Sequence, residues 1–293
     1  MGAMTGNDEA ARKHDRLVAL LRDDLADVVV AYSGGCDSAF LLKVAHDTLG
    51  GARVLGLTAV GASLAPGERD KARELALLIG ARHREVESRE IDNPLYAANP
   101  TNRCYHCKTE LYDLAVAEAR RLGARHVLSG TNADELGDYR PGLKAAAEHG
   151  VRHPLAEVGL TKEEIRSLSR EFGLPTWDKP QTPCLASRLP YGTPVTPERL
   201  AQVDRAEEAV RRAGLKVFRV RHHESIARLE VAEAEHSKLS DPATRAAVNG
   251  ALLAAGYAFA VVDLEPFRSG RLNEAAGLVP LGGRRSEATA RPA

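Results

Sequence analysis

The chain has 293 residues, which is long enough to bury a sizeable core in two domains or in one large one. Its 40 basic residues balance its 40 acidic residues, and this balance argues against a protein whose whole surface binds nucleic acid. No apolar run approaches the roughly 20 residues that cross a membrane, and the first residues lack the apolar core of a signal peptide. We therefore expect a cytoplasmic protein with neither a nucleic-acid nor a membrane partner.

The first half of the chain alternates predicted strands with predicted helices. In chain order we expect strand 27–32, helix 37–49, strand 53–60, helix 66–79, strand 83–86, helix 107–122 and strand 126–130. This alternation is typical of an α/β fold, here a doubly wound, mostly parallel sheet with helices on both faces. A further helix, 161–172, opens with Thr161 and Glu164 at the spacing of a capping box.

The second half begins with a proline-rich segment. Six prolines between residues 175 and 197 disfavour helix, so we expect an extended linker or an active-site loop. Beyond it the pattern predicts helix 197–213, strands 217–221 and 227–231, helix 242–255 and strand 258–264, which together indicate a second, smaller α/β domain. The expected division is a first domain over 12–180 and a second over 181–281, with disordered ends at 1–11 and 282–293.

The first predicted strand runs directly into the loop SGGCDS. A loop between a strand and a helix N-terminus presents unpaired backbone N–H groups, and Gly34 and Gly35 would let the chain approach a phosphate closely. Ser33 and Ser38 add hydroxyl donors, and Asp37 is a candidate to hold Mg²⁺ or to fix the loop. An ordinary glycine turn before a helix is the alternative. The loop is not a P-loop, because no Gly-Lys-Ser/Thr follows at the required spacing. The complete string resembles the PP-loop of the ATP pyrophosphatases, which implies cleavage of ATP between its α- and β-phosphates and transfer of AMP to a carbonyl or carboxylate oxygen.

A second polar loop follows the predicted strand 126–130. Gly130, Thr131 and Asp134 lie in the string SGTNAD, at the carboxyl end of that strand, where open α/β sheets bind ligands. They are candidates for a second contact to the nucleotide or to Mg²⁺, and the choice between Asp37 and Asp134 as the Mg²⁺ ligand stays open. The alternative is an ordinary turn rich in Asn, Gly and Asp.

The four cysteines are too few for a disulfide framework in a chain of this length. Cys104 and Cys107 form a C-x-x-C pair at a predicted helix start, which alone fits zinc, redox, iron–sulfur or packing roles. Cys184, in the proline-rich segment, is a candidate nucleophile. Three thiolates would also ligate an iron–sulfur cluster with one iron left open, or His106 would complete a zinc site. Cys36, at the variable place in the first loop, is expected to be buried filler.

Several longer motifs resemble one family within the PP-loop superfamily. They are NRCYHCK (102–108), SGTNADELGDYRPG (129–142), TPCLASRLPYGTPVTPERL (182–200), FRVRHH, ARLEV and DLEPFRSG. Together they span nearly the whole chain and resemble the LarE family, which makes the nickel-pincer cofactor of lactate racemase. The resemblance implies an enzyme that uses ATP to adenylate the carboxylates of pyridinium-3,5-biscarboxylic acid mononucleotide and converts them to thiocarboxylates. It also implies a homo-oligomer.

Two sulfur sources are known in this family. In one, the cysteine that matches Cys184 attacks the activated carbon and then loses its sulfur, which leaves dehydroalanine. In the other, three cysteines hold a [4Fe-4S] cluster whose free iron carries the transferred sulfide. This sequence has cysteines at all three matching positions, Cys104, Cys107 and Cys184, so the resemblance favours the cluster. A zinc site, or a sacrificial Cys184 with the other two idle, is the alternative.

A substrate with two carboxylates and a phosphate calls for cationic ligands. Arg219 and Arg221 alternate along a predicted strand, so both lie on one face, and each guanidinium suits two parallel hydrogen bonds to an acid. A solvated strand face is the alternative, but the resemblance matches this stretch to the family's phosphate-binding segment and adds acidic positions near the site. The predicted substrate-binding residues are Ser187, Arg188, Glu207, Arg219, Arg221, Glu230 and Arg268.

Three other functions compete with this interpretation. A PP-loop tRNA thiolase shares adenylation and often cysteines, but the balanced charge and the lack of a recognisable RNA-binding module count against it. An amide-forming synthetase of the NAD or GMP type gives the cysteine trio no role, and we expect no glutaminase portion. The third alternative is a nucleotide-binding regulator without catalytic activity, and the intact Ser33, Asp37 and Ser38 argue against it.

Overall fold

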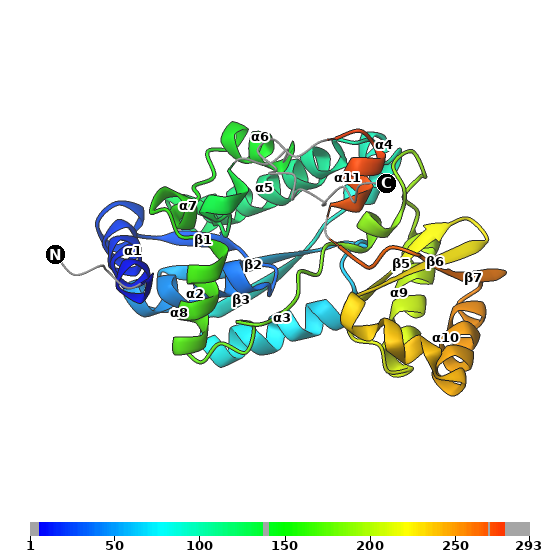
Figure 1. Ribbon diagram of the computed structural model, residues 1–293. Helices are drawn as coiled ribbons and strands as arrows, with labels where there is room; N and C mark the ends of the chain where they lie inside the picture. Colours follow the sequence, from blue (N-terminus) through cyan, green and yellow to red (C-terminus); the bar gives the residue numbers. More distant parts are fainter. Residues whose placement is uncertain (1–5, 137–140, 269, 279–293) are drawn as a thin grey trace.

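A computed structural model describes residues 6–136, 141–268 and 270–278 of the chain. The larger sheet has the strand order β3-β2-β1-β4, and every neighbouring pair is parallel (Figure 1). Its strands are β1 (Val28–Ala31), β2 (Val54–Val60), β3 (Arg82–Glu87) and β4 (His126–Ser129). Each crossover contains a helix that returns the chain to the same edge, which makes the strands parallel. The predicted α/β fold is confirmed.

Helices cover both faces of this sheet. On one face, Val28 and Val30 of β1 pack with α2 (Cys36–Leu49), α3 (Pro66–Ile79) and α8 (Lys162–Glu171). On the other face, Val29 packs with α5 (Arg103–Leu122) and α6 (Pro141–Glu148). Neighbouring residues of one strand point to opposite faces, so β1 contributes to two separate cores and the sheet is doubly wound, as predicted. Two short helices complete this part of the chain, α4 (Pro94–Ala97) and α7 (Pro154–Glu157).

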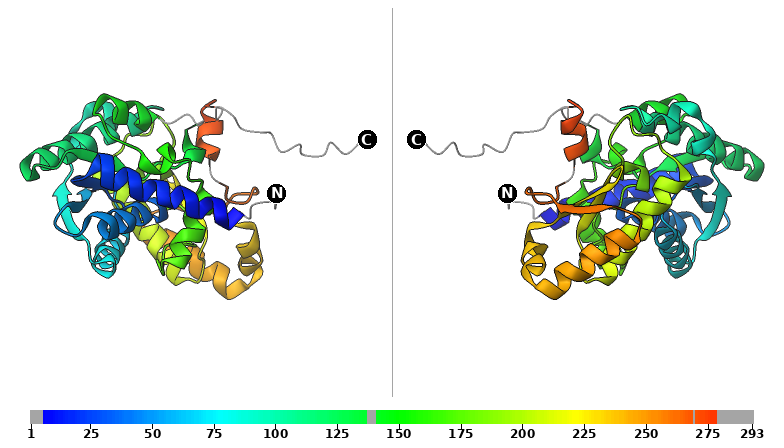
Figure 2. Two further views of the ribbon diagram at one scale, coloured as in Figure 1. Left: turned by 90° about the vertical axis from the view of Figure 1, so that its left-hand side faces the viewer. Right: turned by 90° about the vertical axis from the view of Figure 1, so that its right-hand side faces the viewer.

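The first described element, α1 (Gly6–Leu20), was not predicted. Ala10 and Leu17 are buried, and Lys13 Nζ lies 2.6 Å from Glu164 Oε1 of α8. The helix continues into a π-helical turn, Leu21–Leu25, and runs across the outside of the larger domain (Figure 2). The predicted disorder at 1–11 is therefore wrong from residue 6 onward, because the sparse apolar positions of α1 gain a partner only in the folded protein. Residues 1–5 and the predicted tail 282–293 lie outside the described residues.

The order of the larger sheet brings two loops together. From β1 the chain builds outward through β2 and β3, and then returns to the other side of β1 as β4. The loops that follow β1 and β4 therefore leave the same edge next to each other, at the topological switch point where such sheets bind ligands. Their approach is close, since a Cβ added to Gly130 would lie 2.9 Å from the backbone nitrogen of Ser38.

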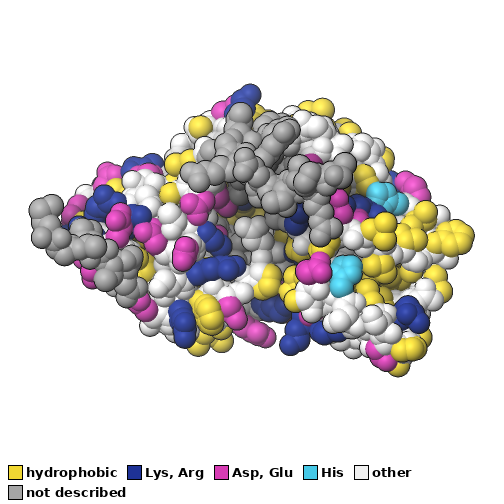
Figure 3. Space-filling view, viewed as in Figure 1, with side chains coloured by type: hydrophobic (Ala, Val, Ile, Leu, Met, Phe, Trp, Pro, Cys, Tyr) yellow, Lys and Arg dark blue, Asp and Glu magenta, His cyan; other side chains and the backbone are white. Residues whose placement is uncertain are grey.

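The smaller sheet has the strand order β5-β6-β7. Strands β5 (Phe218–His223) and β6 (Ile226–Val231) are antiparallel, whereas β7 (Phe259–Val262) pairs parallel with β6. Helices α9 (Pro197–Arg212) and α10 (Pro242–Ala254) pack against this sheet around their own core, so the predicted second α/β layer is confirmed. A 3-10 segment, Glu233–Ser240, was not predicted. Apolar side chains gather at the β7 edge (Figure 3), where Phe259 is 62% exposed.

An irregular segment, 173–196, connects the part of the chain that contains the larger sheet to the part that contains the smaller sheet. It contains one 3-10 turn, Leu185–Arg188, and several of its apolar side chains are buried against Tyr96 in a core of their own. Helix α5 begins at Arg103, about one turn before its predicted start, so the C-x-x-C pair lies within its first two turns. The last described helix is α11 (Arg271–Ala275). Among the described residues, none of the helices has the length and apolar character to span a membrane.

Candidate active site

The loop after β1 is shaped for close approach to an anion. Gly34 has φ of +68°, and a Cβ there would lie 2.8 Å from the Cβ of Ala72, so only glycine fits. Gly35 is the N-cap of α2, which leaves backbone N–H groups at the start of the helix without intrahelical partners. The Ser38 hydroxyl accepts a hydrogen bond from the Ser33 backbone N–H at 3.2 Å and lies 3.1 Å from the Ser33 hydroxyl. These groups together form a suitable phosphate site.

Asp37 and Asp134 meet at Lys162, the first residue of α8. Lys162 Nζ lies 2.6 Å from Asp37 Oδ2, and the Lys162 backbone N–H donates to Asp134 Oδ2 at 2.8 Å. The other carboxylate oxygen of Asp37, Oδ1, is buried and has no hydrogen-bond partner among the described residues. A buried carboxylate oxygen is costly unless a ligand satisfies it. The donor chemistry of Asp37 therefore fits Mg²⁺, whereas Asp134 holds the start of α8.

The polar loop after β4 completes this edge of the sheet. Thr131 is buried, and its hydroxyl lies 3.5 Å from that of Ser129. Gly130 lies against the start of α2, where a side chain would collide with the backbone of Asp37 and Ser38. The loop predicted as a second nucleotide contact thus lies directly beside the first.

Lys179 is a second cation at the phosphate loop that the sequence did not single out. Its Nζ donates to the Gly34 carbonyl at 3.1 Å and lies 2.7 Å from Glu68 Oε2. Burial opposes ionisation of Glu68, but hydrogen bonds and charge from Lys179 and Lys71 lower the pKa of Glu68 to about 2. Lys162 was missed as well. Both are single lysines among 40 basic residues, and only the tertiary fold brings them to the loop.

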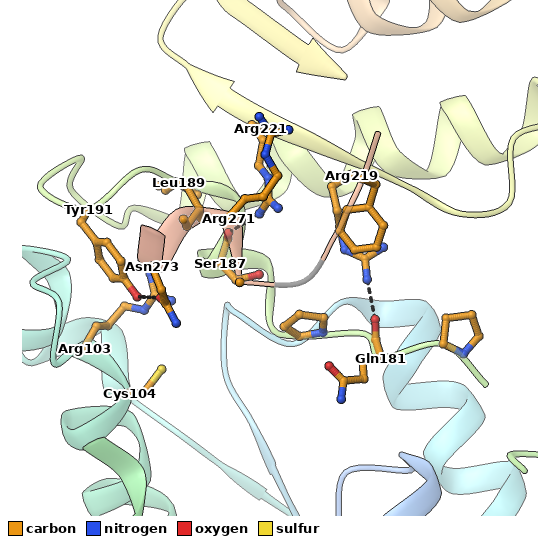
Figure 4. A pocket seen from close by; sticks show the side chains of 15 residues that line it. Arg103, Cys104, Gln181, Ser187, Leu189, Tyr191, Arg219, Arg221, Arg271 and Asn273 are labelled. Carbon is orange, nitrogen blue, oxygen red and sulfur yellow. Dashed lines mark hydrogen bonds between the residues drawn. The ribbon is translucent and has the colours of Figure 1, made fainter. Parts of the chain in front are cut away.

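A cavity of about 430 Å³ opens between α5, the segment 173–196 and β5 (Figure 4). Arg103 and Cys104 project into it from α5, and Arg219 and Arg221 from β5 (Figure 4). The lining residues are Arg103, Cys104, Pro180, Gln181, Pro183, Ser187, Leu189, Tyr191, Arg219, Arg221, Phe267, Gly270, Arg271, Leu272 and Asn273. The concentration of guanidinium groups makes this a cavity for a multiply charged anion.

The two predicted arginines of β5 differ in their partners. Arg221 donates twice to Glu230 Oε2, at 2.9 Å from Nε and 2.7 Å from Nη2. Arg219 donates to the carbonyls of Phe218 and Gln181, and its guanidinium lies 4.6 Å from the centroid of the Phe267 ring. No carboxylate of the described residues pairs with it. Burial, and then repulsion from Arg188, lower the pKa of Arg219 to about 10. Arg219 is therefore a buried cation without an acidic partner, which an incoming acid would supply.

Other predicted substrate ligands lie behind the cavity wall. Arg188 is buried and bidentate to Glu207, with both distances 2.9 Å, and it also donates to the Pro183 carbonyl and the Ser187 hydroxyl. This arrangement occupies Arg188 in holding the turn that follows Cys184. Glu207 and Glu230 are buried beneath the arginines that they neutralise, so they orient cations rather than face a ligand.

Arg268 does not reach the cavity. It pairs with Glu274 at the surface, whereas Arg271, which was not predicted, lines the cavity and lies 2.9 Å from Asp263 Oδ2. Among the predicted substrate-binding residues, Ser187, Arg219 and Arg221 line the cavity directly. A loop between strand and helix carries no periodic signal that would have distinguished Arg268 from Arg271.

The three candidate thiols come from two segments that converge here. Cys104 is exposed at the cavity, and Cys107 and Cys184 are half-buried against the core of the connecting segment. Burial, and then the nearby Cys184, raise the pKa of the Cys107 thiol to about 12. In the ranges that the structure describes, no three Cys, His, Asp or Glu side chains are gathered as a metal-binding group. The donor set fits a cluster with three cysteine ligands in kind, but the thiols are not drawn together around one point.

Cys36 lies apart from these thiols. It is the first residue of α2, its side chain is buried in the core, and its Sγ lies 3.8 Å from the Ser169 hydroxyl. Burial raises the pKa of Cys36, which disfavours the reactive thiolate. Its surroundings agree with the expectation of buried filler.

Comparison with known proteins extends these observations. No protein-family model matches the chain. An uncharacterised protein of Synechocystis sp. is 43% identical over 250 residues, which are 85% of this chain and 93% of that protein. The tRNA-specific 2-thiouridylase MnmA of Rickettsia africae is 29% identical over 202 residues, which are only 55% of this chain and 54% of that enzyme. The pyridinium-3,5-bisthiocarboxylic acid mononucleotide synthase of Lactiplantibacillus plantarum is 38% identical over 264 residues, which are 90% of this chain and 95% of the synthase. Because this last similarity extends over almost the whole of both proteins, the chain belongs to the LarE family within the PP-loop superfamily.

Proposed function

We propose that this protein is an ATP-dependent sulfur insertase that converts the carboxylates of pyridinium-3,5-biscarboxylic acid mononucleotide into thiocarboxylates. One observation carries the proposal: a single segment joins all parts of the site. Lys179 of this segment contacts the phosphate loop, Cys184 lies in its middle, and Ser187 lines the arginine-rich cavity. The name of the L. plantarum relative, a bisthiocarboxylic acid mononucleotide synthase, describes the product of the same chemistry.

In the first step ATP binds with its phosphates at the loop 33–38. Gly34, Gly35 and the start of α2 would surround the phosphates with N–H donors, and Lys162 and Lys179 would offset their charge. Mg²⁺, held by Asp37, would neutralise the departing pyrophosphate. A carboxylate oxygen of the substrate attacks the α-phosphorus, the bond to the β-phosphate oxygen breaks, and an acyl adenylate and pyrophosphate result.

The cavity would hold the substrate during this step. Arg219 lacks a carboxylate partner among the described residues, so it would pair with the phosphate or with a carboxylate of the mononucleotide. Arg221 and Ser187 would add donors from the same wall. Glu230 holds Arg221 in place, so the site is arranged before the ligand arrives.

For the sulfur source we favour a [4Fe-4S] cluster held by Cys104, Cys107 and Cys184, which would supply a transferable sulfide. The sacrificial alternative uses the Cys184 thiolate itself. It displaces AMP to form a thioester, and cleavage of its Cβ–S bond with loss of the Cα proton then leaves dehydroalanine. Iron content and absorbance of anaerobically purified protein distinguish the two. Absence of iron, together with loss of one sulfur from Cys184 after turnover, would exclude the cluster.

We also propose that the protein forms a homo-oligomer. The support is the β7 edge, where Phe259, Val261, Val262 and Leu264 are 62%, 43%, 48% and 98% exposed. Apolar edge strands of this kind are usually covered by a partner. Sedimentation velocity tests the proposal, and a monomer at all concentrations would contradict it.

The direct test of the proposed activity is the dependence of AMP release on the acceptor. With ATP and Mg²⁺, we expect AMP and pyrophosphate to form only when the biscarboxylate mononucleotide is present. Unmodified tRNA is the matched control, because the PP-loop relative MnmA is named as acting on tRNA. AMP release that requires tRNA, and not the mononucleotide, would overturn the proposal.

A further inference from the structure

The two cysteine-bearing segments are joined by a buried polar contact that Asn99 and Arg103 make. Asn99, between α4 and α5, is fully buried and has φ of +54°. Its Nδ2 donates to the carbonyls of Pro190 and Thr193, at 2.7 and 2.8 Å. Its backbone carbonyl accepts from the Gly192 N–H at 2.9 Å. Asn99, which precedes α5, thus fixes the stretch of chain that follows Cys184.

Arg103 extends this contact to the cysteines. It is buried, its Nη1 donates to Asn99 Oδ1 at 2.5 Å, and the same nitrogen donates to the Ala186 carbonyl at 2.8 Å. Arg103 directly precedes Cys104 in α5, and Ala186 lies two residues after Cys184. A single guanidinium therefore ties the start of the C-x-x-C helix to the turn that carries the third thiol.

Apolar packing alone would not fix this relationship. Leu185, Ala186 and Leu189 hold the connecting segment against Tyr96, but such contacts are non-directional and tolerate sliding. The hydrogen bonds of Asn99 and Arg103 are directional and buried, so a shift along the segment would leave several polar groups without partners. The polar contact therefore sets the register of the Cys184 turn against α5, and the apolar contacts hold it down.

We propose that Asn99 and Arg103 are positioning residues that set Cys184 at its working distance from Cys104 and Cys107, and so serve sulfur transfer rather than adenylation. The expected effect on sulfur transfer rests on the proposed function, whereas the placement of Cys184 by Asn99 and Arg103 does not. A displacement of about 1 Å in a reacting group is enough to lower a rate about 100-fold. Asn99 holds residues 190 to 193, which follow Cys184, whereas Lys179, which contacts the phosphate loop, precedes it, so adenylation should be retained when the contacts of Asn99 are removed.

The test uses the full chain with Arg103→Lys, Arg103→Gln and Asn99→Asp. Asn99→Asp keeps the size of the residue and its contact to Arg103 but removes the two donors to the connecting segment. Arg120→Lys is the control, since Arg120 is exposed near the other end of α5. Two quantities are measured for each variant: the yield of Cys184 linked to Cys104 or Cys107 by a short bifunctional thiol reagent on iron-free protein, and the kcat of thiocarboxylate formation beside that of AMP formation.

We expect Asn99→Asp to lower both the crosslink yield and the kcat of sulfur transfer by about tenfold or more, with AMP formation and the substrate KM within about twofold of the parent. Arg103→Gln should lower the crosslink yield to a similar extent, and because Arg103 also lines the cavity, it should raise the substrate KM as well. Arg103→Lys should be intermediate and Arg120→Lys unchanged. Equal crosslinking in all variants, no crosslink in the parent protein, or a parallel loss of AMP formation in Asn99→Asp would overturn the inference. If the parent protein makes no thiocarboxylate, the proposed function fails, while the crosslink still reports on the placement.

Discussion

Replacing Arg219 with glutamine tests whether Arg219 binds an acidic group of the substrate in the cavity. Arg219 is buried and, within the described ranges, donates hydrogen bonds only to carbonyl oxygens, so its removal leaves no buried carboxylate there without a partner. What the variant should lose is the hydrogen bond between Arg219 and an acidic group of the substrate. A hydrogen bond to a charged group contributes about 1.5–3 kcal/mol. Since about 1.4 kcal/mol is a factor of ten, we expect kcat/KM for the mononucleotide to fall by about 10- to 150-fold.

The stability of the Arg219→Gln variant should not fall. Burial lowers the pKa of Arg219 below its usual range, to about 10, so at neutral pH the folded protein holds this proton less tightly than the unfolded chain. That penalty is fully present below the folded pKa and disappears only as the pH rises above it. Removing the charge should therefore leave the melting temperature at pH 7 unchanged or higher.

Arg221→Gln is the contrasting variant. It removes the guanidinium that donates twice to the fully buried Glu230, which keeps only longer contacts to Arg228 and Arg271, at 3.2 and 3.5 Å. Breaking a buried pair costs about 3–5 kcal/mol, so this variant should lose both activity and stability. The assays are AMP release against substrate concentration at saturating ATP, and thermal unfolding. An unchanged substrate KM in Arg219→Gln, or a loss of stability equal to that of Arg221→Gln, would refute the reasoning.

Three further predictions concern the nucleotide loop and the thiols. Gly34→Ala should abolish AMP formation in a folded protein, because a Cβ would lie 2.8 Å from that of Ala72; retained ATP turnover would disprove the close approach. The pKa of Glu68 is lowered to about 2, so its stabilisation should be lost as the pH falls from about 4.5 to 2, and Glu68→Gln should flatten acid unfolding there. An unaltered acid limb would contradict the ion pair. Cys184→Ser should keep AMP release but lose thiocarboxylate formation, whereas Cys36→Ala should keep both, as mass spectrometry of the product would show.

Much of the fold follows from local patterns. Pro66 and the apolar spacing after it placed α3 at Pro66–Ile79 as predicted, and the capping box of Thr161 and Glu164 is present. Helix α1 was not predicted, because its apolar positions are too few to indicate a helix in the absence of α8, against which it packs. Helix α5 begins at Arg103 rather than at residue 107, and Arg103 is fixed there by hydrogen bonds to Asn99 and Ala186, which local propensity does not reveal. Local sequence therefore predicts elements that carry their own start signals, and misses those that tertiary contacts complete.

The candidate site divides in the same way. The loop 33–38 and the alternation of Arg219 and Arg221 are local, so the sequence identified them. Lys162 reaches Asp37 from 125 residues away, and Arg103 reaches Ala186 from 83 residues away, so no periodicity could reveal either pair. For the same reason, the difference between Arg219 and Arg221 depends on where carboxylates lie across the fold, not on spacing.

The proposed reaction replaces carboxylate oxygen with sulfur at the expense of ATP. The most direct measurement is anaerobic incubation with ATP, Mg²⁺ and pyridinium-3,5-biscarboxylic acid mononucleotide, followed by mass spectrometry of the small molecules and of the protein. We predict that the mononucleotide gains sulfur in place of oxygen, with AMP released for each carboxylate converted. An unchanged mononucleotide in the presence of bound ATP and intact protein would contradict the account.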